Sequence, residues 1–364
     1  MLRKAEGLYR VTLTPSEEIS VMKFFDSPSR LILAAVCFAR IAVIDVADIG
    51  AAELPLVRIA HGAFSEKVVA LWLGAEQGLF RKHGVNIEVI NIRSGPQTMA
   101  ALVSGDIHVA YTIPGSVVSA ATSGLDVAFF AGIVNKADGD FIAGTSIRSA
   151  EDLKGKRIGV QSIGGGVWSM AMLAIEHLGL EPNRDKMTIM VIGDSPVLAQ
   201  SLESGGIEAT YLNYTHSRAL KEKGLPVLLD LGKAPIPYQG LAAATRRGYL
   251  KQNPQLVDAL MRGFVETVAF IHRPGNKEIV IKSLVKNLRL KSAQDAEIGY
   301  GALQWLYNLD IKPTIPGIQN MARFLALSNP KIKSVKSEDV VDDAPWLRLE
   351  KSPFYREVLA AAKK

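Results

Sequence analysis

The chain has 364 residues, enough for two or three domains that each bury a full hydrophobic core. Its composition, 48% hydrophobic and 21% charged, is typical of a globular protein and excludes a largely disordered one. The net charge of +6 is spread along the chain, without a basic cluster among aromatic residues or a recognition-helix pattern, which argues against nucleic-acid binding.

Cysteine and histidine usage argues against redox and metal chemistry. The one cysteine, Cys37, lies in the N-terminal segment, and the six histidines are scattered without HxxxH or HExxH spacing. We therefore predict no metal site, no cofactor and no catalytic residue.

Residues 1–52 are predicted to form a leader. From Met22 the chain has the pattern of a secretory signal, with Lys23 and Arg30 before the apolar run 31–39. The apolar run is too short and too interrupted to form a membrane-spanning helix. Together with the signal-like pattern, this predicts a periplasmic protein. Met22 as the true start would explain the polar residues that precede it.

Two features of this leader leave its processing open. Arg40 interrupts the apolar pattern, and the small residues 50–52 offer a cleavage site. A lipid anchor at Cys37 is an alternative, although Val36 is large where a small residue is preferred.

From residue 56 onward, strand patterns alternate with helix patterns. A turn at 62–65, where Ser65 can cap a helix, leads into the first of these helices. Such alternation predicts a parallel sheet flanked by helices. The predicted strands are 57–60, 85–92, 109–111 and 127–131, and the predicted helices are 68–80, 98–103 and the segment up to Gly124.

The chain then repeats itself at an offset of one hundred residues. Leu102, Ser104 and Gly105, for example, recur as Leu202, Ser204 and Gly205. Two lobes built on one plan explain this match, and a local architecture common to strand–helix units is the alternative.

A glycine turn at 164–166 joins the strand 156–160 to a helix at 169–178. Glycine lets a ligand approach the backbone, and the first turn of the helix offers unpaired N–H groups that favour an anion or a carbonyl. The alternative is a glycine helix cap without a ligand.

The crossings between the lobes set the predicted boundaries. Lobe 1 takes residues 53–136 and 240–364, and lobe 2 takes residues 137–239. The C-terminal part is mostly helical and is expected to pack on lobe 1. Two crossings make a hinge, and a hinge places a cleft between the lobes.

Three phrases carry a family resemblance: LGAEQGLFRKHGVNIEV at 73–89, ALVSGDIHVA at 101–110 and SAEDLKGKRIGV at 149–160. With the glycine turn, they resemble the nitrate/sulfonate/taurine-type substrate-binding proteins of ABC transporters, a superfamily that includes the thiamine-pyrimidine-precursor binders. The resemblance covers roughly residues 56–330. It implies a type II periplasmic binding-protein fold, two α/β lobes, and delivery of a ligand to a membrane permease with its ATPase.

The sequence departs from the enzymes of that superfamily. The precursor-synthesising enzymes use a Cys-rich motif and histidines that this chain lacks, and the desulfinases need a cysteine that would not remain after the leader. An enzyme on the same fold, acting on a small sulfonate- or pyrimidine-type substrate, stays as an alternative. A cytoplasmic ligand-sensing domain of a regulator is a third alternative, but such a protein requires a DNA-binding segment.

The candidate ligand contacts lie at the predicted carboxyl ends of strands, where open α/β sheets bind ligands. They are Phe64, Ser65, Arg93, Ser94, Gly95, Thr112, Ser162, Gly164, Gly165, Gly166, Trp168, Asp194, Asn213, Tyr214 and Tyr238.

These candidates have different expected roles. Arg93 can pair a carboxylate or sulfonate, or lie on the surface. The aromatic rings of Phe64 and Trp168 can stack on a ligand or fill the lobe interface. The hydroxyls can simply cap helices. Asp194 would favour a cationic or amide-bearing ligand if it reaches the cleft. The prediction is a monomeric solute-binding protein for a small organic ligand, anionic or carbonyl-bearing.

Overall fold

A computed structural model describes residues 53–92 and 94–362. The predicted leader and the candidate Arg93 lie outside the described residues. In the described part of the chain, no helix is long and apolar enough to cross a membrane.

The first sheet has five strands in the order β2-β1-β3-β10-β4. Its strands are β1 (Leu56–His61), β2 (Asn86–Asn91), β3 (Val109–Thr112), β4 (Val127–Gly132) and β10 (Ala242–Arg246). β1 pairs in parallel with β2 and β3, whereas β10 lies antiparallel between β3 and β4. The prediction of a purely parallel sheet is therefore wrong at this position, because a strand from after the second crossing is inserted.

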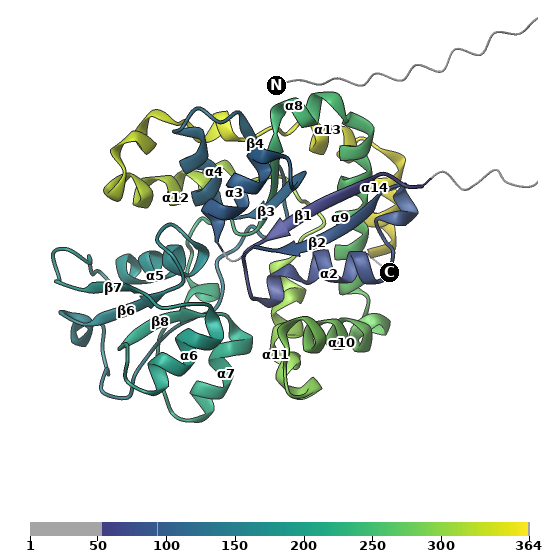
Figure 1. The fold of residues 1–364 in the computed structure, drawn as a ribbon. Helices are drawn as coiled ribbons and strands as arrows, with labels where there is room; N and C mark the ends of the chain where they lie inside the picture. Colours follow the sequence, from purple (N-terminus) through teal and green to yellow (C-terminus); the bar gives the residue numbers. More distant parts are fainter. Residues whose placement is uncertain (1–52, 93, 363–364) are drawn as a thin grey trace, which may run out of the picture. The chain divides into compact units, whose positions relative to one another are not determined.

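The second sheet has the same plan, in the order β7-β6-β8-β5-β9. Its strands are β5 (Asp140–Ala143), β6 (Arg157–Val160), β7 (Thr188–Val191), β8 (Ala209–Leu212) and β9 (Val227–Asp230). β6 pairs in parallel with β7 and β8, and β5 lies antiparallel between β8 and β9. We call the two sheets with their flanking helices lobe 1 and lobe 2 (Figure 1).

The helices confirm the internal repeat. In lobe 1, α3 (Gly95–Ser104) follows β2 and α4 (Pro114–Ala121) follows β3. In lobe 2, α6 (Ser195–Glu203) and α7 (Tyr214–Glu222) occupy the same places after β7 and β8. β1 to β4 correspond to β6 to β9 in order and pairing, so the sequence match reflects two copies of one sheet plan.

Two crossings connect the lobes and pair with each other. The N–H of Gly240 donates to the carbonyl of Val134 at 2.7 Å, and the N–H of Val134 donates to the carbonyl of Leu241 at 3.1 Å. Lys136 and Pro237 form a further antiparallel bridge. The crossings therefore run side by side, as a hinge requires. The exact lobe limits at 136/137 and 239/240 remain a prediction.

The C-terminal part is helical, and it packs mainly on lobe 1, as predicted. α9 (Pro254–His272) packs against α2 (Val69–Glu76), with Phe80 between them. A Cβ at Gly74 or Gly263 would lie 2.3 Å from the Phe80 ring, so both helices need glycine where they enclose it. The other helices are α8 (Arg247–Gln252), α10 (Lys277–Leu288), α11 (Ala293–Leu306), α12 (Ile315–Ser328), α13 (Ala344–Glu350) and α14 (Pro353–Ala362).

Two of these helices also reach lobe 2. α11 packs against α7, and α12 packs against both α4 of lobe 1 and α5 (Gly166–His177) of lobe 2. On α12, the guanidinium of Arg323 forms a two-bond ion pair with Glu176 of α5. The C-terminal helices therefore contribute to the interface between the lobes.

Truncation of a buried ring in β4 should destabilise the fold. Phe129→Ala removes a fully buried side chain and should lower the free energy of unfolding by about 3–5 kcal/mol in urea titrations. Leu327→Ala is the control, because that side chain on α12 is 75% exposed and its removal should have little effect. Equal losses from both variants would contradict the assignment of β4 to the core.

Candidate functional site

A cavity lies where residues from both lobes meet at the carboxyl ends of strands. It encloses about 770 Å³ of space not filled by atoms, part of it open to solvent. The described residues that line it are Gly62, Ala63, Phe64, Ser65, Lys67, Ser94, Gly95, Tyr111, Thr112, Ile113, Ser116, Gln161, Ser162, Gly165, Gly166, Val167, Ser195, Tyr211, Asn213, Tyr238, Gly240 and Leu241.

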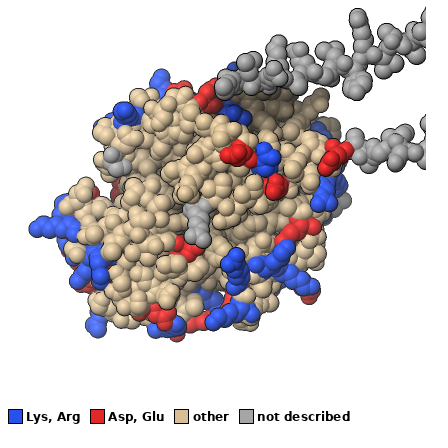
Figure 2. Space-filling model, viewed as in Figure 1, with Lys and Arg blue, Asp and Glu red and all other residues tan. Residues whose placement is uncertain are grey.

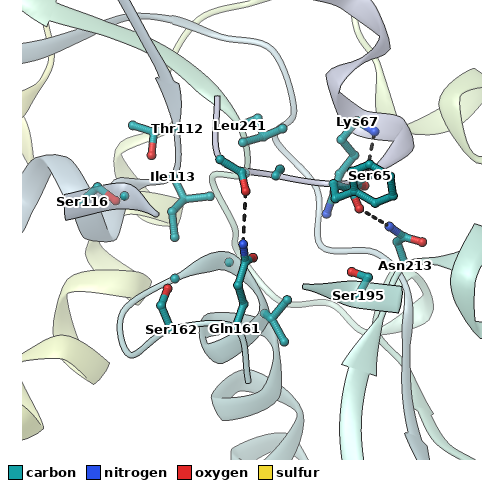
Figure 3. A pocket seen from close by; sticks show the side chains of 18 of the residues that line it. Ser65, Lys67, Thr112, Ile113, Ser116, Gln161, Ser162, Ser195, Asn213 and Leu241 are labelled. Carbon is teal, nitrogen blue, oxygen red and sulfur yellow. Dashed lines mark hydrogen bonds between the residues drawn. The ribbon is translucent and has the colours of Figure 1, made fainter. Parts of the chain in front are cut away.

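Most of the predicted site residues are brought together here. The candidates that line the cavity are Phe64, Ser65, Ser94, Gly95, Thr112, Ser162, Gly165, Gly166, Asn213 and Tyr238. They come from strand ends and helix starts in both lobes and from the second crossing. In Figure 3, Thr112 and Ser116 of lobe 1 stand across the cavity from Gln161 and Ser162 of lobe 2.

Four candidates lie outside this lining. The indole of Trp168 is 6% exposed and packs in the hydrophobic core. The hydroxyl of Tyr214 donates to Asp230 at 2.5 Å, which directs that side chain elsewhere. Asp194 precedes α6 with an exposed side chain. Gly164 lines an adjoining groove instead.

Three helices begin at the cavity without a side-chain cap among the described residues. The N-cap residues of α4, α5 and α6 are Ile113, Gly165 and Asp194. Ile113 and Gly165 have no side-chain acceptor, and the Asp194 carboxylate accepts no hydrogen bond from the first turn of α6. Each helix contributes a first-turn residue to the lining. The N–H groups there, at the positive ends of three helix dipoles, are free to meet a ligand oxygen.

Other candidates do act as helix caps. The Ser94 hydroxyl accepts from the N–H of Gln97 at 3.4 Å, and the Asn213 side-chain oxygen accepts from the N–H of His216 at 3.0 Å. Ser65 caps the short helix that leads into α2. The capping role is therefore present at these positions, and the same side chains border the cavity.

An ion pair that the sequence analysis missed lies at one end of the cavity. The ammonium of Lys67 is 2.6 Å from an oxygen of Asp138, on the first crossing, and donates to the hydroxyl of Tyr211 at 3.2 Å. Lys67 is 8% exposed and Asp138 is fully buried. Among the described lining residues Lys67 alone carries a charge, and Asp138 neutralises it.

Next to this pair, Glu66 carries a fully buried carboxyl group. One of its oxygens has no hydrogen-bond partner among the described residues. Burial, reinforced by the nearby charge of Asp138, raises the pKa of Glu66 to about 7. A Cβ at Gly299 of α11 would lie 2.4 Å from the Thr215 hydroxyl and 3.4 Å from the Glu66 Cβ, so this glycine allows elements of both lobes to close over Glu66.

His61 lies outside the cavity and is engaged on both ring nitrogens. Its Nδ1 is 3.0 Å from the carbonyl of Ala63, and its Nε2 accepts from the indole N–H of Trp72 at 3.3 Å. Burial lowers the pKa of His61 to about 4, so the ring is neutral at physiological pH. This geometry favours a structural role for His61.

Direct contacts close the lobes around the cavity. The side-chain amide of Gln161 in lobe 2 donates to the carbonyl of Gly62 in lobe 1 at 3.3 Å (Figure 3). The side-chain amide of Asn213 donates to the carbonyl of Phe64 at 3.4 Å. A Cβ at Gly115 would lie 2.6 Å from the carbonyl oxygen of Gly164, so backbone meets backbone across the interface.

The sequence matches the model of the NMT1/THI5-like family over residues 66–275, more than half of the chain. The chain belongs to this family. A search of curated proteins found no match.

Solved structures share the fold of this NMT1/THI5-like protein at low sequence identity. The alkanesulfonate-binding protein SsuA from Xanthomonas axonopodis pv. citri, bound to MOPS, has a TM-score of 0.67 and 20% identity, and the match covers 81% of this chain and 100% of that one. The periplasmic nitrate-binding protein NrtA from Synechocystis PCC 6803 has a TM-score of 0.63 and 16% identity, over 85% and 89% of the chains. These likenesses confirm the predicted periplasmic binding-protein fold.

A more distant likeness is to a DSZB mutant in complex with biphenyl-2-sulfinic acid, with a TM-score of 0.53 and 15% identity over 84% and 99% of the chains. In this NMT1/THI5-like chain, the described cavity lining contains no cysteine, histidine or carboxylate. The described residues also include no group of three metal-ligating side chains. The hydroxyl groups of the described lining can donate and accept hydrogen bonds, and no histidine or carboxylate stands beside them in that lining to activate them.

The buried Glu66 should make stability depend on pH. The folded protein holds a proton on Glu66 up to about pH 7, whereas the unfolded chain releases it near 4.5, so the free energy of unfolding should fall as the pH rises between these values. The expected fall is on the order of 3 kcal/mol. When Glu66→Gln is unfolded by chemical denaturant at several pH values in this range, its free energy of unfolding should not show this fall. Glu88→Gln, which changes an exposed residue of β2, should keep the wild-type profile, and an identical profile for both variants would contradict the assignment.

Proposed function

We propose that this protein is an exported solute-binding protein that captures a small organic ligand between its two lobes and delivers it to an ABC importer. The observation that carries the proposal is the cavity, which both lobes line with helix N-termini and short hydroxyl side chains. Such a site holds a ligand through many hydrogen bonds made at once, and closure of the lobes completes it.

The ligand we propose bears a carboxylate, a sulfonate or a polarised carbonyl. Three uncapped helix N-termini at the cavity favour partial or full negative charge. Asp138 neutralises the Lys67 ammonium, so the favourable field arises from backbone dipoles rather than from that side chain. Ser162, Thr112 and Tyr238 are placed to complete the hydrogen bonding around the group.

Delivery to a permease and its ATPase is the part of the proposal that the family and the likeness to periplasmic binding proteins for sulfonates and nitrate support. Export rests on the leader pattern in residues 1–52. A binding role is favoured over catalysis because the described lining lacks an activated nucleophile or base.

The direct test is to identify the bound molecule. Protein exported by its native host, purified under native conditions and then denatured, should release a small anion or carbonyl compound that mass spectrometry detects in stoichiometric amount. Incubation of that compound with the protein should return it chemically unchanged. Turnover of the compound would instead support an enzyme on this fold.

Gly165→Val should abolish binding of that compound in calorimetry. A Cβ at Gly165 would lie 2.4 Å from the Ser162 hydroxyl, and the branched side chain would fill the space where the first turn of α5 meets the ligand. Gly301→Val is the matched control, because a Cβ on that glycine of α11 has no neighbour within 4 Å in the described structure. If Gly165→Val binds with unchanged affinity and both variants unfold thermally like the wild type, the glycine turn is not part of the ligand site.

A further inference from the structure

A carboxyl group is buried where the two lobes meet beside the hinge. Glu66 begins the short helix Glu66–Val68 of lobe 1, directly after the cavity residue Ser65, and is fully buried. The Ser65 hydroxyl donates to one oxygen of Glu66 at 3.3 Å, and the other oxygen has no hydrogen-bond partner among the described residues. A buried carboxyl group bonded in this way is poorly stabilised as an anion.

The cover over Glu66 comes from both lobes. Thr215 at the start of α7 and Tyr211 of β8 approach it from lobe 2, and Asp138 approaches it from the first crossing. On the lobe 1 side, Gly299 of α11 leaves room for this contact, because a Cβ there would lie 2.4 Å from the Thr215 hydroxyl and 3.4 Å from the Glu66 Cβ. Opening of the hinge would carry Thr215 and Tyr211 away with lobe 2 and admit water to Glu66.

The number of charges in this buried cluster depends on one proton. Most charged side chains visible in Figure 2 stand around the edge of that face, where water solvates them. Glu66, Lys67 and Asp138 are buried instead, and the Lys67 ammonium is paired with Asp138 at 2.6 Å. With Glu66 ionised, closed lobes would bury two negative charges and one positive charge. A proton on Glu66 leaves a neutral ion pair, which is far less costly to bury.

The other titratable groups around Glu66 supply no second positive charge. Burial raises the pKa of Tyr111, Tyr211 and Tyr307, so these phenols stay neutral. On α7, burial lowers the pKa of His216 to about 4, so this ring is neutral as well. The remaining ionisable side chains of α2, α7, α11 and the first crossing contact other groups: Glu76 with Lys286, Tyr214 with Asp230, Arg218 with Glu222, Lys221 with Asp140, Asp295 with Ser292, Glu297 and Tyr300 with Lys277, and Lys136 with the carbonyl of Trp305.

The pKa of Glu66 has the direction that this geometry requires. Burial, and then the charge of Asp138, raises it to about 7 in the closed lobes. Water that reached the carboxyl group in open lobes would return the pKa toward its ordinary value of 4.5. Because the closed form binds the proton more tightly, protonation stabilises closure. This stabilisation is complete below the lower value and is lost as the pH rises through the upper one.

We propose that Glu66 couples closure of the lobes to a proton, which this carboxyl group takes up when the protein closes and releases when it opens. The inference rests on the proposed function and adds a regulation of its site, since a falling pH favours the closed form that holds the ligand and a rising pH favours release. An anionic ligand acts in the same direction, because the proton removes a negative charge beside the cavity.

Distances between spin labels on the two lobes test this coupling. Glu88→Cys in lobe 1 and Gln200→Cys in lobe 2 change exposed residues, and Cys37→Ser removes the native thiol. In dialysed protein, double electron–electron resonance should show the separation of the closed lobes in a growing share of molecules as the pH falls from about 8 to about 5. The ratio of closed to open molecules should change by at most about tenfold per pH unit, because one proton is taken up.

Two variants of the labelled protein assign the proton. Glu66→Gln keeps the size of the side chain but cannot titrate, so its closed share should not depend on pH. Glu278→Gln makes the same change at an exposed residue of α10 and should follow the wild type. At about pH 6, the infrared spectra of the wild type and of Glu278→Gln should contain the carbonyl stretch of a protonated carboxyl group that Glu66→Gln lacks. Thermal melts confirm that each variant is folded.

The outcomes separate this inference from the proposed function. A closed share that is independent of pH in the wild type would overturn the inference, as would a wild-type pH dependence or the same infrared band in Glu66→Gln. These results would leave the solute-binding role intact, because the compound released from natively purified protein tests that role. If no compound were released, the proposed function would be contradicted, whereas the spin-label distances would still decide whether Glu66 couples closure to a proton.

Discussion

The buried ion pair of Lys67 and Asp138 determines the electrostatics of the cavity. Two buried charges are tolerated only when they are paired and hydrogen-bonded. The Tyr211 hydroxyl of lobe 2 bonds both members of this pair, and the second oxygen of Asp138 has no partner among the described residues. Because the ammonium is held by Asp138, it offers little net charge to a ligand. The remaining polar groups of the lining are the helix N-termini and the hydroxyls, and both lobes contribute them.

The internal repeat separates what the fold needs from what the site needs. Both lobes keep the same strand order, the same antiparallel insertion and the same helix positions. They differ where the cavity lies. Gly95 at the start of α3 has Ser195 as its counterpart on α6. Gly95 and Ser195 both line the cavity, so matching positions of the two copies bring different residues to one site.

Local patterns carried most of what could be predicted from the sequence. Strand ends, helix starts and the repeat depend on neighbouring residues, so residues such as Ser94 and Gly165 were found at the cavity. The insertion of β10 and the pairing of Lys67 with Asp138 depend on segments far apart in the chain, and no local pattern indicates them. Trp168 was misplaced for a related reason, because the direction of a side chain on α5 depends on which core the helix covers.

The inserted strand β10 also has a consequence for the order of folding. Every residue of β4 is buried, and within the described sheet β4 pairs with β10, which follows the whole of lobe 2 in the chain. All five strands of lobe 2, by contrast, lie in one uninterrupted segment. A chain synthesised from its N-terminus can assemble the second sheet before the first has the strand that joins β3 to β4, with long-range closure as the slow step. The lobe whose strands come first in the chain is then the last to be completed.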